Sequence, residues 1–239
     1  MIKVGSLARI TFFCMGVISM VSVRIWDVPT RLFHWSLVLC TVGLVITGES
    51  GGDAMLWHFR LGYAVLTLLG FRLLWGLVGG HWSRWWRLPL APASVRAYLR
   101  GQAPLSHTAG HNPLGSWSVL GLMLLCALQV GTGLFSEDDV GNAGPLSVLV
   151  SGQWVGWITS WHKDPGKALL LALVGLHVAA IVWYRWRHGE NLVRPMLRGD
   201  KDLPAPVPAS RDGVLNWLLA ALCMALSALG VRALVALGA

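Results

Sequence analysis

Five long apolar segments constrain the fold of this chain more than any other feature of its sequence. Each contains about 20 residues, enough for a helix to cross the roughly 30 Å of hydrocarbon in a bilayer. Charged residues make up only 13% of the 239 residues, well below the content of a typical soluble domain. The chain is therefore predicted to be an all-α integral membrane protein. The segments cover approximately residues 31–49, 57–79, 117–135, 166–186 and 214–237.

The loops between these segments alternate in charge. Residues 80–116 and 187–213 are rich in arginine, and their charge accounts for much of the net charge of +8. Basic loops of membrane proteins stay in the cytoplasm, so both loops are predicted there, with the C-terminus in the periplasm of a bacterial inner membrane. Nucleic acid is not an expected partner. The loop at 136–165 is acidic, with one lysine, Lys163, against Glu137, Asp138, Asp139 and Asp164.

The two ends of the chain fall outside the helical pattern. Residues 1–22 contain an apolar run that is too short to span a bilayer. A signal-like segment, an interfacial helix and an extension ahead of a later start codon all fit this run, and we favour a loosely attached extension. Residues 201–213 include "LPAPVPASRDG", which predicts a proline-rich linker to an appended fifth transmembrane helix at 214–239.

Four of the eight histidines lie within or beside apolar segments, where an ionisable residue is costly and usually has a partner. His34 lies one turn into the first segment, and His177 lies about ten residues before the end of the fourth. Both belong to the cytoplasmic half. His58 opens the second segment and His162 precedes the fourth, so both belong to the outer half. The remaining histidines are predicted to be ordinary loop residues: His81, His107, His111 and His188.

A histidine pair from separate helices can hold one b-type haem, because haem iron accepts imidazole nitrogen as an axial ligand. The second ring nitrogen then needs a hydrogen bond, to a carbonyl or to a hydroxyl such as Ser36 or Thr41. Two pairs predict two stacked haems b and no catalytic residue, since iron with two imidazoles has no open position. Helix contacts or interfacial positions are the alternative roles. The predicted ligand pairs are His34 with His177, and His58 with His162.

Three arginines lie where they can meet the haem propionates, which are anions that need cations or hydrogen-bond donors. Arg31 is close to His34, Arg60 is close to His58, and Arg72 lies toward the cytoplasmic end of the second segment. Each is a candidate propionate ligand. The alternative is that the side chain extends to the membrane interface.

Seven stretches of sequence together resemble the family of bacterial cytochrome b561 and of the b-type cytochrome subunits of nickel-iron hydrogenases. They are "RIWDVPTRLFHW", "HFRLGYAVL" with "FRLLWGLVG", "GHNPLGSWSV", "GTGLFSEDD", "LHVAAI" and "GENLVRPMLRG". The resemblance covers about residues 22–200 and implies a dihaem domain at 23–200. It implies a four-helix bundle with both haems held from the first, second and fourth helices. It also implies electron transfer between a quinone pool and a partner protein.

The spacing of the last two predicted ligands departs from this family. The family usually separates them by 14 residues, whereas "HKDPGKALLLALVGLH" separates His162 from His177 by 15. Pro165 lies between them and would clash with a continuous helix unless it occupied the first turn. Either His162 precedes the helix, or a kink absorbs the extra residue.

Three functional hypotheses follow. The leading one is a dihaem cytochrome that carries electrons between quinone or quinol and a periplasmic redox protein such as a c-type cytochrome. The acidic loop would suit the docking of a basic partner, although ordinary charge asymmetry explains it too. The second is the cytochrome b anchor of a hydrogenase or other dehydrogenase, and hence a subunit of a quinone-linked oxidoreductase. The third is a small transporter with intramembrane histidines, although the internal repeats common in such folds are missing.

Overall fold

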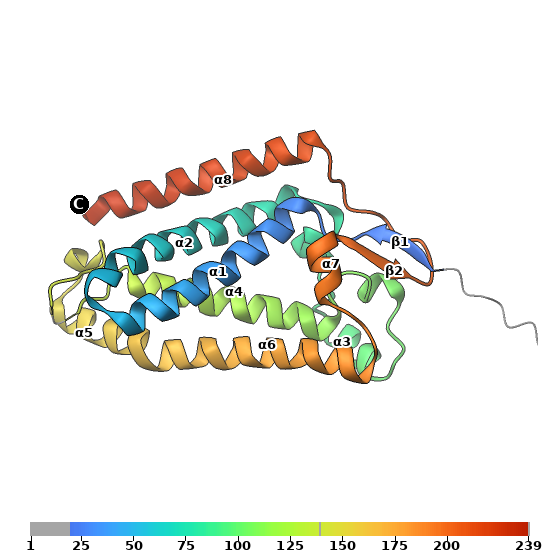
Figure 1. Ribbon diagram of the computed structural model, residues 1–239, viewed down its shortest axis with the longest axis horizontal. Coiled ribbons are helices and arrows are strands. Elements are labelled where there is room, and N and C mark those ends of the chain that lie inside the picture. Colours follow the sequence, from blue (N-terminus) through green and yellow to red (C-terminus); the bar gives the residue numbers. More distant parts are fainter. Residues whose placement is uncertain (1–19, 139, 239) are drawn as a thin grey trace, which may run out of the picture.

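Long helices run side by side along the whole length of the molecule (Figure 1). The computed structural model describes residues 20–138 and 140–238. In this part of the chain, five helical stretches are long and apolar enough to cross a membrane. The predicted all-α membrane bundle with a fifth helix is therefore confirmed. The helices are α1 (Val28–Ser50), α2 (Met55–Val78), α4 (Pro113–Gly133), α5 (Gly152–Trp161) continuing into α6 (Lys167–Arg187), and α8 (Val214–Val235).

Shorter elements connect the long helices. Two are α-helical, α3 (Pro92–Leu99) and α7 (Val193–Arg198). Two strands, β1 (Val21–Arg24) and β2 (Asp200–Leu203), pair antiparallel. The single turns are η1 (Gly52–Ala54), η2 (His81–Ser83), η3 (Trp85–Arg87), η4 (Leu105–His107), η5 (Ser147–Leu149), the π-helical turn η6 (His162–Gly166) and η7 (Ala236–Gly238).

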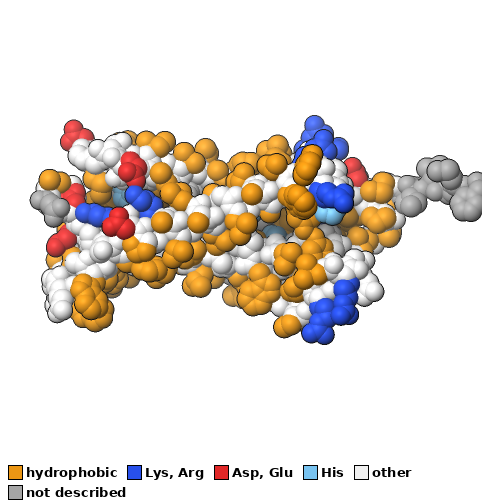
Figure 2. Space-filling view, turned by 90° about the horizontal axis from the view of Figure 1, so that it is seen from below, with side chains coloured by type: hydrophobic (Ala, Val, Ile, Leu, Met, Phe, Trp, Pro, Cys, Tyr) orange, Lys and Arg blue, Asp and Glu red, His pale blue; other side chains and the backbone are white. Residues whose placement is uncertain are grey.

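An apolar belt separates two ends of opposite charge (Figure 2). Leu39, Leu124 and Leu176 lie in this belt and are 73%, 70% and 65% exposed, which suits a hydrocarbon solvent and not water. We call the end that carries the α1–α2 and α4–α5 loops the acidic end. The end that carries the α2–α4 and α6–α8 loops is the basic end. This separation agrees with the charge pattern from which the orientation in the membrane is predicted.

The fourth span begins at Gly152 and not near residue 166, as predicted. The reason is the π turn η6, which contains Pro165 and joins α5 to α6 without a break. A π turn inserts one residue into an α-helix, so it absorbs the extra residue between His162 and His177. The extra residue is thus absorbed within the helix, as one of the two alternatives expected, although by a π turn in place of a kink. His162 lies inside the helical stretch and does not precede it.

A buried carboxylate joins the start of α1 to the end of α2. Asp27 is fully buried and caps α1 by accepting a hydrogen bond from the Thr30 amide at 2.8 Å. It also accepts from the Trp75 indole at 3.3 Å, the Gly80 amide at 3.2 Å and the Ser83 hydroxyl at 3.0 Å. A Cβ at Gly80 would lie 2.2 Å from Asp27 Oδ2, so only glycine fits there. Burying this carboxylate is tolerable because four donors satisfy it.

Residues that precede the first helix and residues that follow α7 pack together at the basic end. Val21 pairs with Leu203, so residues 21–22 of the predicted extension belong to β1, while residues 1–19 lie outside the described residues. The predicted linker at 201–213 is packed onto the bundle. The Ser210 hydroxyl donates to Ile25 O at 2.6 Å, and the Trp82 indole donates to Pro208 O at 2.8 Å.

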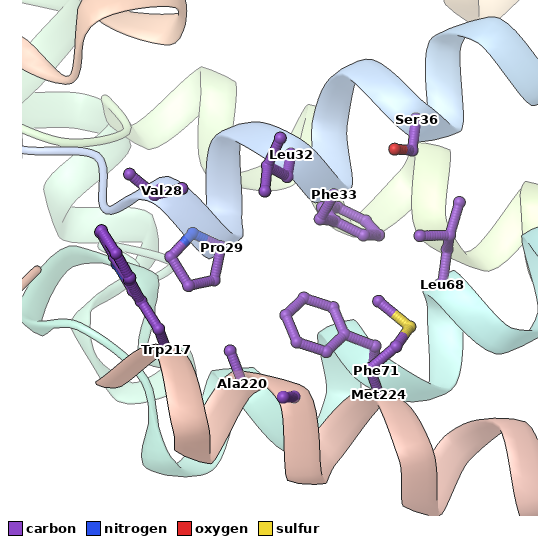
Figure 3. A pocket seen from close by; sticks show the side chains of 11 residues that line it. Val28, Pro29, Leu32, Phe33, Ser36, Leu68, Phe71, Trp217, Ala220 and Met224 are labelled. Carbon is purple, nitrogen blue, oxygen red and sulfur yellow. The ribbon is translucent and has the colours of Figure 1, made fainter. Parts of the chain in front are cut away.

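Helix α8 packs closely along α2, on the side away from α6 (Figure 1). A Cβ at Gly70 would lie 2.2 Å from Ser227 Oγ, and the Ser227 hydroxyl donates to Thr67 O at 2.7 Å. Small residues allow such close approach between membrane helices. Near the basic end the packing opens into a cavity of about 400 Å³ between α1, α2 and α8, with Phe33 and Ser36 in its lining (Figure 3).

Replacing Asp27 with alanine should destabilise the protein by about 3 kcal/mol, because buried donors would lose their acceptor. The measurement is the midpoint of unfolding by sodium dodecyl sulfate, followed by circular dichroism. The matched control is Asp53→Ala, at an exposed carboxylate in η1, which should change stability by less than about 0.5 kcal/mol. Equal midpoints for the two variants would contradict the role assigned to Asp27.

Candidate haem-binding site

Two histidine rings face each other near the acidic end. His58 lies in the first turn of α2 and His162 begins η6, and their ring centroids are 6.1 Å apart with an interplanar angle of 90°. A metal bound to both rings at about 2 Å per bond would separate the ring centres by roughly 6 Å. The two side chains therefore already stand at the distance that one shared metal atom requires.

The hydrogen bonds of these rings determine which nitrogen is available. His58 Nδ1 lies 3.0 Å from Leu44 O, and His162 Nδ1 lies 2.9 Å from Gln129 O. A carbonyl oxygen can only accept, so Nδ1 carries the proton in both rings. Nε2 of each ring is then left with a lone pair, which is the form that binds a metal.

A cavity of about 440 Å³ surrounds this pair, within the usual size range of cofactor pockets. Side chains from α1, α2, α4, η6 and α6 line it, including the apolar Val65, Cys126 and Leu170. In the described part of the chain, no three histidine, cysteine or acidic side chains converge as a metal site. Haem iron does not need such a group, because the porphyrin supplies four nitrogens. The cavity and its two imidazoles therefore fit haem.

The second predicted pair lies in a polar cluster toward the basic end. His34 projects from α1 and His177 from α6. Beside them, in the loop before α4, the pKa of His111 is lowered to about 3, by burial first and then by the charges of Arg72, His34 and His177. The charges of both predicted ligands and of Arg72 thus act on the same buried imidazole, which indicates that these side chains share one region of the bundle.

Several buried nitrogens in this region have no hydrogen-bond partner among the described residues. They include Nη1 of Arg72, which is only 3% exposed and whose guanidinium lies over Trp85 at 4.2 Å. Guanidinium nitrogens are always donors, and a buried donor without an acceptor is costly, so the arginines among them indicate a site for an anion. Haem propionates are such anions and fit these guanidinium groups. The nitrogens are Arg31 Nε, His34 Nδ1, Arg72 Nη1, His107 Nδ1 and His111 Nδ1.

Comparison with known sequences agrees with this arrangement. The profile of the family described as prokaryotic cytochrome b561 matches residues 25–199. The chain belongs to the prokaryotic cytochrome b561 family. It is accordingly a b-type cytochrome and a multi-pass bacterial membrane protein. Its cofactor is haem b, and its role is electron transport. The matched residues run from the end of β1 to the end of α7, so α8 lies outside them.

Curated relatives of this cytochrome carry names of one kind. The "Probable Ni/Fe-hydrogenase 1 B-type cytochrome subunit" of Escherichia coli strain K12 is 29% identical over 217 residues, covering 76% of this chain and 91% of the relative. The "Probable Ni/Fe-hydrogenase B-type cytochrome subunit" of Azotobacter chroococcum is 28% identical over 199 residues, covering 66% and 79%. No solved structure matches this chain.

The π turn explains how this cytochrome accommodates a spacing of 15 residues between His162 and His177. With one residue absorbed by η6, the spacing acts as 14 α-helical residues, which leave the two side chains about 40° apart around the helix. Both histidines therefore face the same side, toward α1 and α2. Along the helix they lie about 21 Å apart, which places them in opposite halves of the bundle.

The other two arginines predicted to bind propionates are less buried than Arg72. Arg31 donates to Leu197 O at 2.5 Å. Arg60 is exposed, and its guanidinium lies 5.1 Å from the ring of Trp57. At the cavity, the cationic side chains among the described lining residues are Lys163 and Lys167.

The predicted hydroxyl partners of the ligand rings are elsewhere. Ser36 lines the apolar cavity of Figure 3, and Thr41 lines the haem cavity without a hydrogen bond to His58 or His162 among the described contacts. The general expectation of a carbonyl acceptor is confirmed at the acidic end. The particular carbonyls come from neighbouring helices, so sequence proximity did not point to them.

The burial of one loop histidine was not predicted from the sequence. His111 was predicted to be an ordinary loop residue, but its ring packs 4.6 Å from that of Trp26 and its Nδ1 is buried. The loop is held in place by Asn112, which caps α4 through the Gly115 amide at 2.7 Å. The motif "GHNPLGSWSV", which is part of the family resemblance, was the available signal.

The length of the helix between His162 and His177 can be tested directly. Deleting Asp164 should remove the π turn and keep both ligands on one face, so haem content should be unchanged. Inserting one alanine after Asp164 should rotate one ligand by about 100° relative to the other and lower haem content. The measurement is haem per chain by the pyridine haemochrome method. Haem loss on deletion, or full retention on insertion, would contradict this account of η6.

Proposed function

We propose that this protein is a dihaem b-type cytochrome that carries electrons across the membrane between quinone or quinol and a periplasmic redox partner. One haem is held at the acidic end by His58 and His162, and the other toward the basic end by His34 and His177. The observation that carries the proposal is the acidic-end pair, with ring centroids 6.1 Å apart and both Nδ1 atoms bound to carbonyls.

The chemistry of the bound group is reversible one-electron exchange at iron. The protein's part would be to supply two imidazoles to each iron, and iron with two imidazole ligands would have no open position for oxygen or substrate. The separation of about 21 Å between His162 and His177 along one helix supports two sites in opposite halves of the membrane. Such a pair forms a path for electrons from one face to the other.

The propionates of the haem nearer the basic end are held, in this proposal, by Arg72 and Arg31. Both have a buried nitrogen without a partner among the described residues, and Arg72 is almost wholly buried. Arg60 is the third arginine predicted to bind a propionate. The structure supports this prediction less well, because its exposed guanidinium lies over Trp57. That placement suits an interfacial arginine better.

A second candidate is a membrane anchor for a hydrogenase or another dehydrogenase. The relatives' names support it, since they describe hydrogenase B-type cytochrome subunits. In that case electrons enter from a bound enzyme and leave through quinone. The positive-inside pattern favours a periplasmic acidic end, where the exposed Glu137 and Asp164 would be available to a partner. A transporter is disfavoured by membership in a cytochrome family.

Histidine variants test the dihaem arrangement. His58→Ala and His177→Ala should each remove one haem, and each a different one, because the two residues belong to separate pairs. The measurements are haem stoichiometry, the reduced-minus-oxidised absorption spectrum and redox titration of the purified protein. His188→Ala, at an exposed position, is the control and should keep the full haem content. A full complement in either ligand variant would refute the proposed pairing.

Purification under mild conditions distinguishes the two candidates. An anchor subunit should co-purify with a large metalloenzyme, and this association should weaken in the double variant Glu137→Gln, Asp164→Asn if the acidic end makes the contact. A free carrier should purify alone and reduce a basic soluble cytochrome at a rate that falls as ionic strength rises. A rate that is independent of salt would argue against docking through the acidic end.

A further inference from the structure

Two five-residue segments at the acidic end have the same design. Residues 44–48 of α1 read "LVITG", and residues 129–133 of α4 read "QVGTG". In each segment the carbonyl of the first residue accepts the Nδ1–H of a predicted ligand, His58 or His162. A threonine follows at the fourth position and a glycine at the fifth.

Each threonine hydroxyl adds a second acceptor beside the carbonyl. Thr47 Oγ1 lies 3.3 Å from His58 Nδ1, and Thr132 Oγ1 lies 3.2 Å from His162 Nδ1. Each hydroxyl donates its own hydrogen to the carbonyl four residues earlier in its helix, at 2.7 and 2.8 Å. Its oxygen lone pairs are therefore left for the imidazole. Each ring N–H group thus has two acceptors, a carbonyl and a hydroxyl. Both come from a helix, α1 or α4, that supplies no ligand to the same iron.

Each glycine allows the imidazole to approach the helix. A Cβ at Gly48 would lie 3.1 Å from Cε1 of His58, and a Cβ at Gly133 would lie 3.0 Å from Cε1 of His162. Both distances are shorter than ordinary side-chain contacts. The helical partner of the accepting carbonyl is the amide of this same glycine, four residues on. Without a side chain at that position, the carbonyl's second lone pair is accessible to the ring.

We propose that residues 44–48 and 129–133 are two copies of one imidazole cradle, which sets the rotation of the two axial ligands of the acidic-end haem at 90° to each other. Thr47, Gly48, Thr132 and Gly133 are its positioning residues. The inference rests on the proposed function, because it assumes that His58 and His162 share an iron. It gives α4 a role in haem binding although α4 supplies no ligand.

The angle between the ligand planes has a direct spectroscopic signature. Perpendicular imidazoles leave the two iron d orbitals that interact with the ring π systems nearly equal in energy, and rotation toward parallel planes separates them. The largest g value of the low-spin ferric haem in electron paramagnetic resonance reports this separation. Hydrogen bonds from Nδ1–H to an acceptor make the imidazole a stronger donor to ferric iron and so lower the midpoint potential.

The glycines are tested by Gly48→Ala and Gly133→Ala. Each added methyl should push its imidazole aside, and so shift the largest g value of the acidic-end haem or release that haem, while the other haem signal stays unchanged. Gly131→Ala is the matched control, because it is in the same helix as Gly133 and a Cβ there meets nothing within 4 Å. An unchanged spectrum in both glycine variants would overturn the cradle.

The threonines are tested by the double variant Thr47→Val, Thr132→Val, which keeps side-chain shape and removes both hydroxyls. The midpoint potential of the acidic-end haem should rise, with haem content and the other haem's potential unchanged. An unaltered potential would remove the threonines from the cradle. If His58→Ala leaves haem content intact, the proposed function itself fails. If His58→Ala removes a haem but the cradle variants behave as the parent protein, only this inference fails.

Discussion

The structure of this cytochrome depends on one constraint, that polar groups within a bilayer must find their partners inside the protein. The imidazole N–H groups of His58 and His162 meet it by bonding to the carbonyls of Leu44 and Gln129, on two neighbouring helices. Each bond orients a ring, determines its tautomer and ties two helices together. The same contacts therefore orient the two predicted haem ligands and stabilise the packing of helices at the acidic end.

The two ends of the bundle prepare for the cofactor in different ways. At the acidic end the protein satisfies the second ring nitrogens itself, and glycines bring backbone close to the rings. Toward the basic end, His34, Arg72 and His111 keep buried nitrogens without partners among the described residues. Only the Arg72 guanidinium nitrogen among them is a donor in every state, and the proposed propionate is an acceptor that would suit it. The acidic end thus orients its two imidazoles through backbone carbonyls, whereas the basic end leaves a buried guanidinium without a partner among the described residues.

A local irregularity in the fourth span also affects the position of a predicted haem ligand. The π turn η6 carries His162 and keeps it in line with His177 despite one additional residue. Beyond the family match, residues 200–203 and Ser210 pack against β1 and its neighbours, which covers the basic end, and α8 adds a further layer on α2. The part of the chain beyond the family match is thereby packed against the bundle in two places.

The sequence by itself determined the number of spans, their charge asymmetry and the depth of the four ligand candidates, because the thickness and low polarity of a bilayer leave few alternatives. The family followed from short motifs. Only the tertiary structure decided which carbonyls hold the rings, that His111 has a buried ring nitrogen and that the fourth span begins at Gly152. These features arise from contacts between segments distant in sequence or from a backbone irregularity, and neither leaves a periodic signal in the amino-acid pattern.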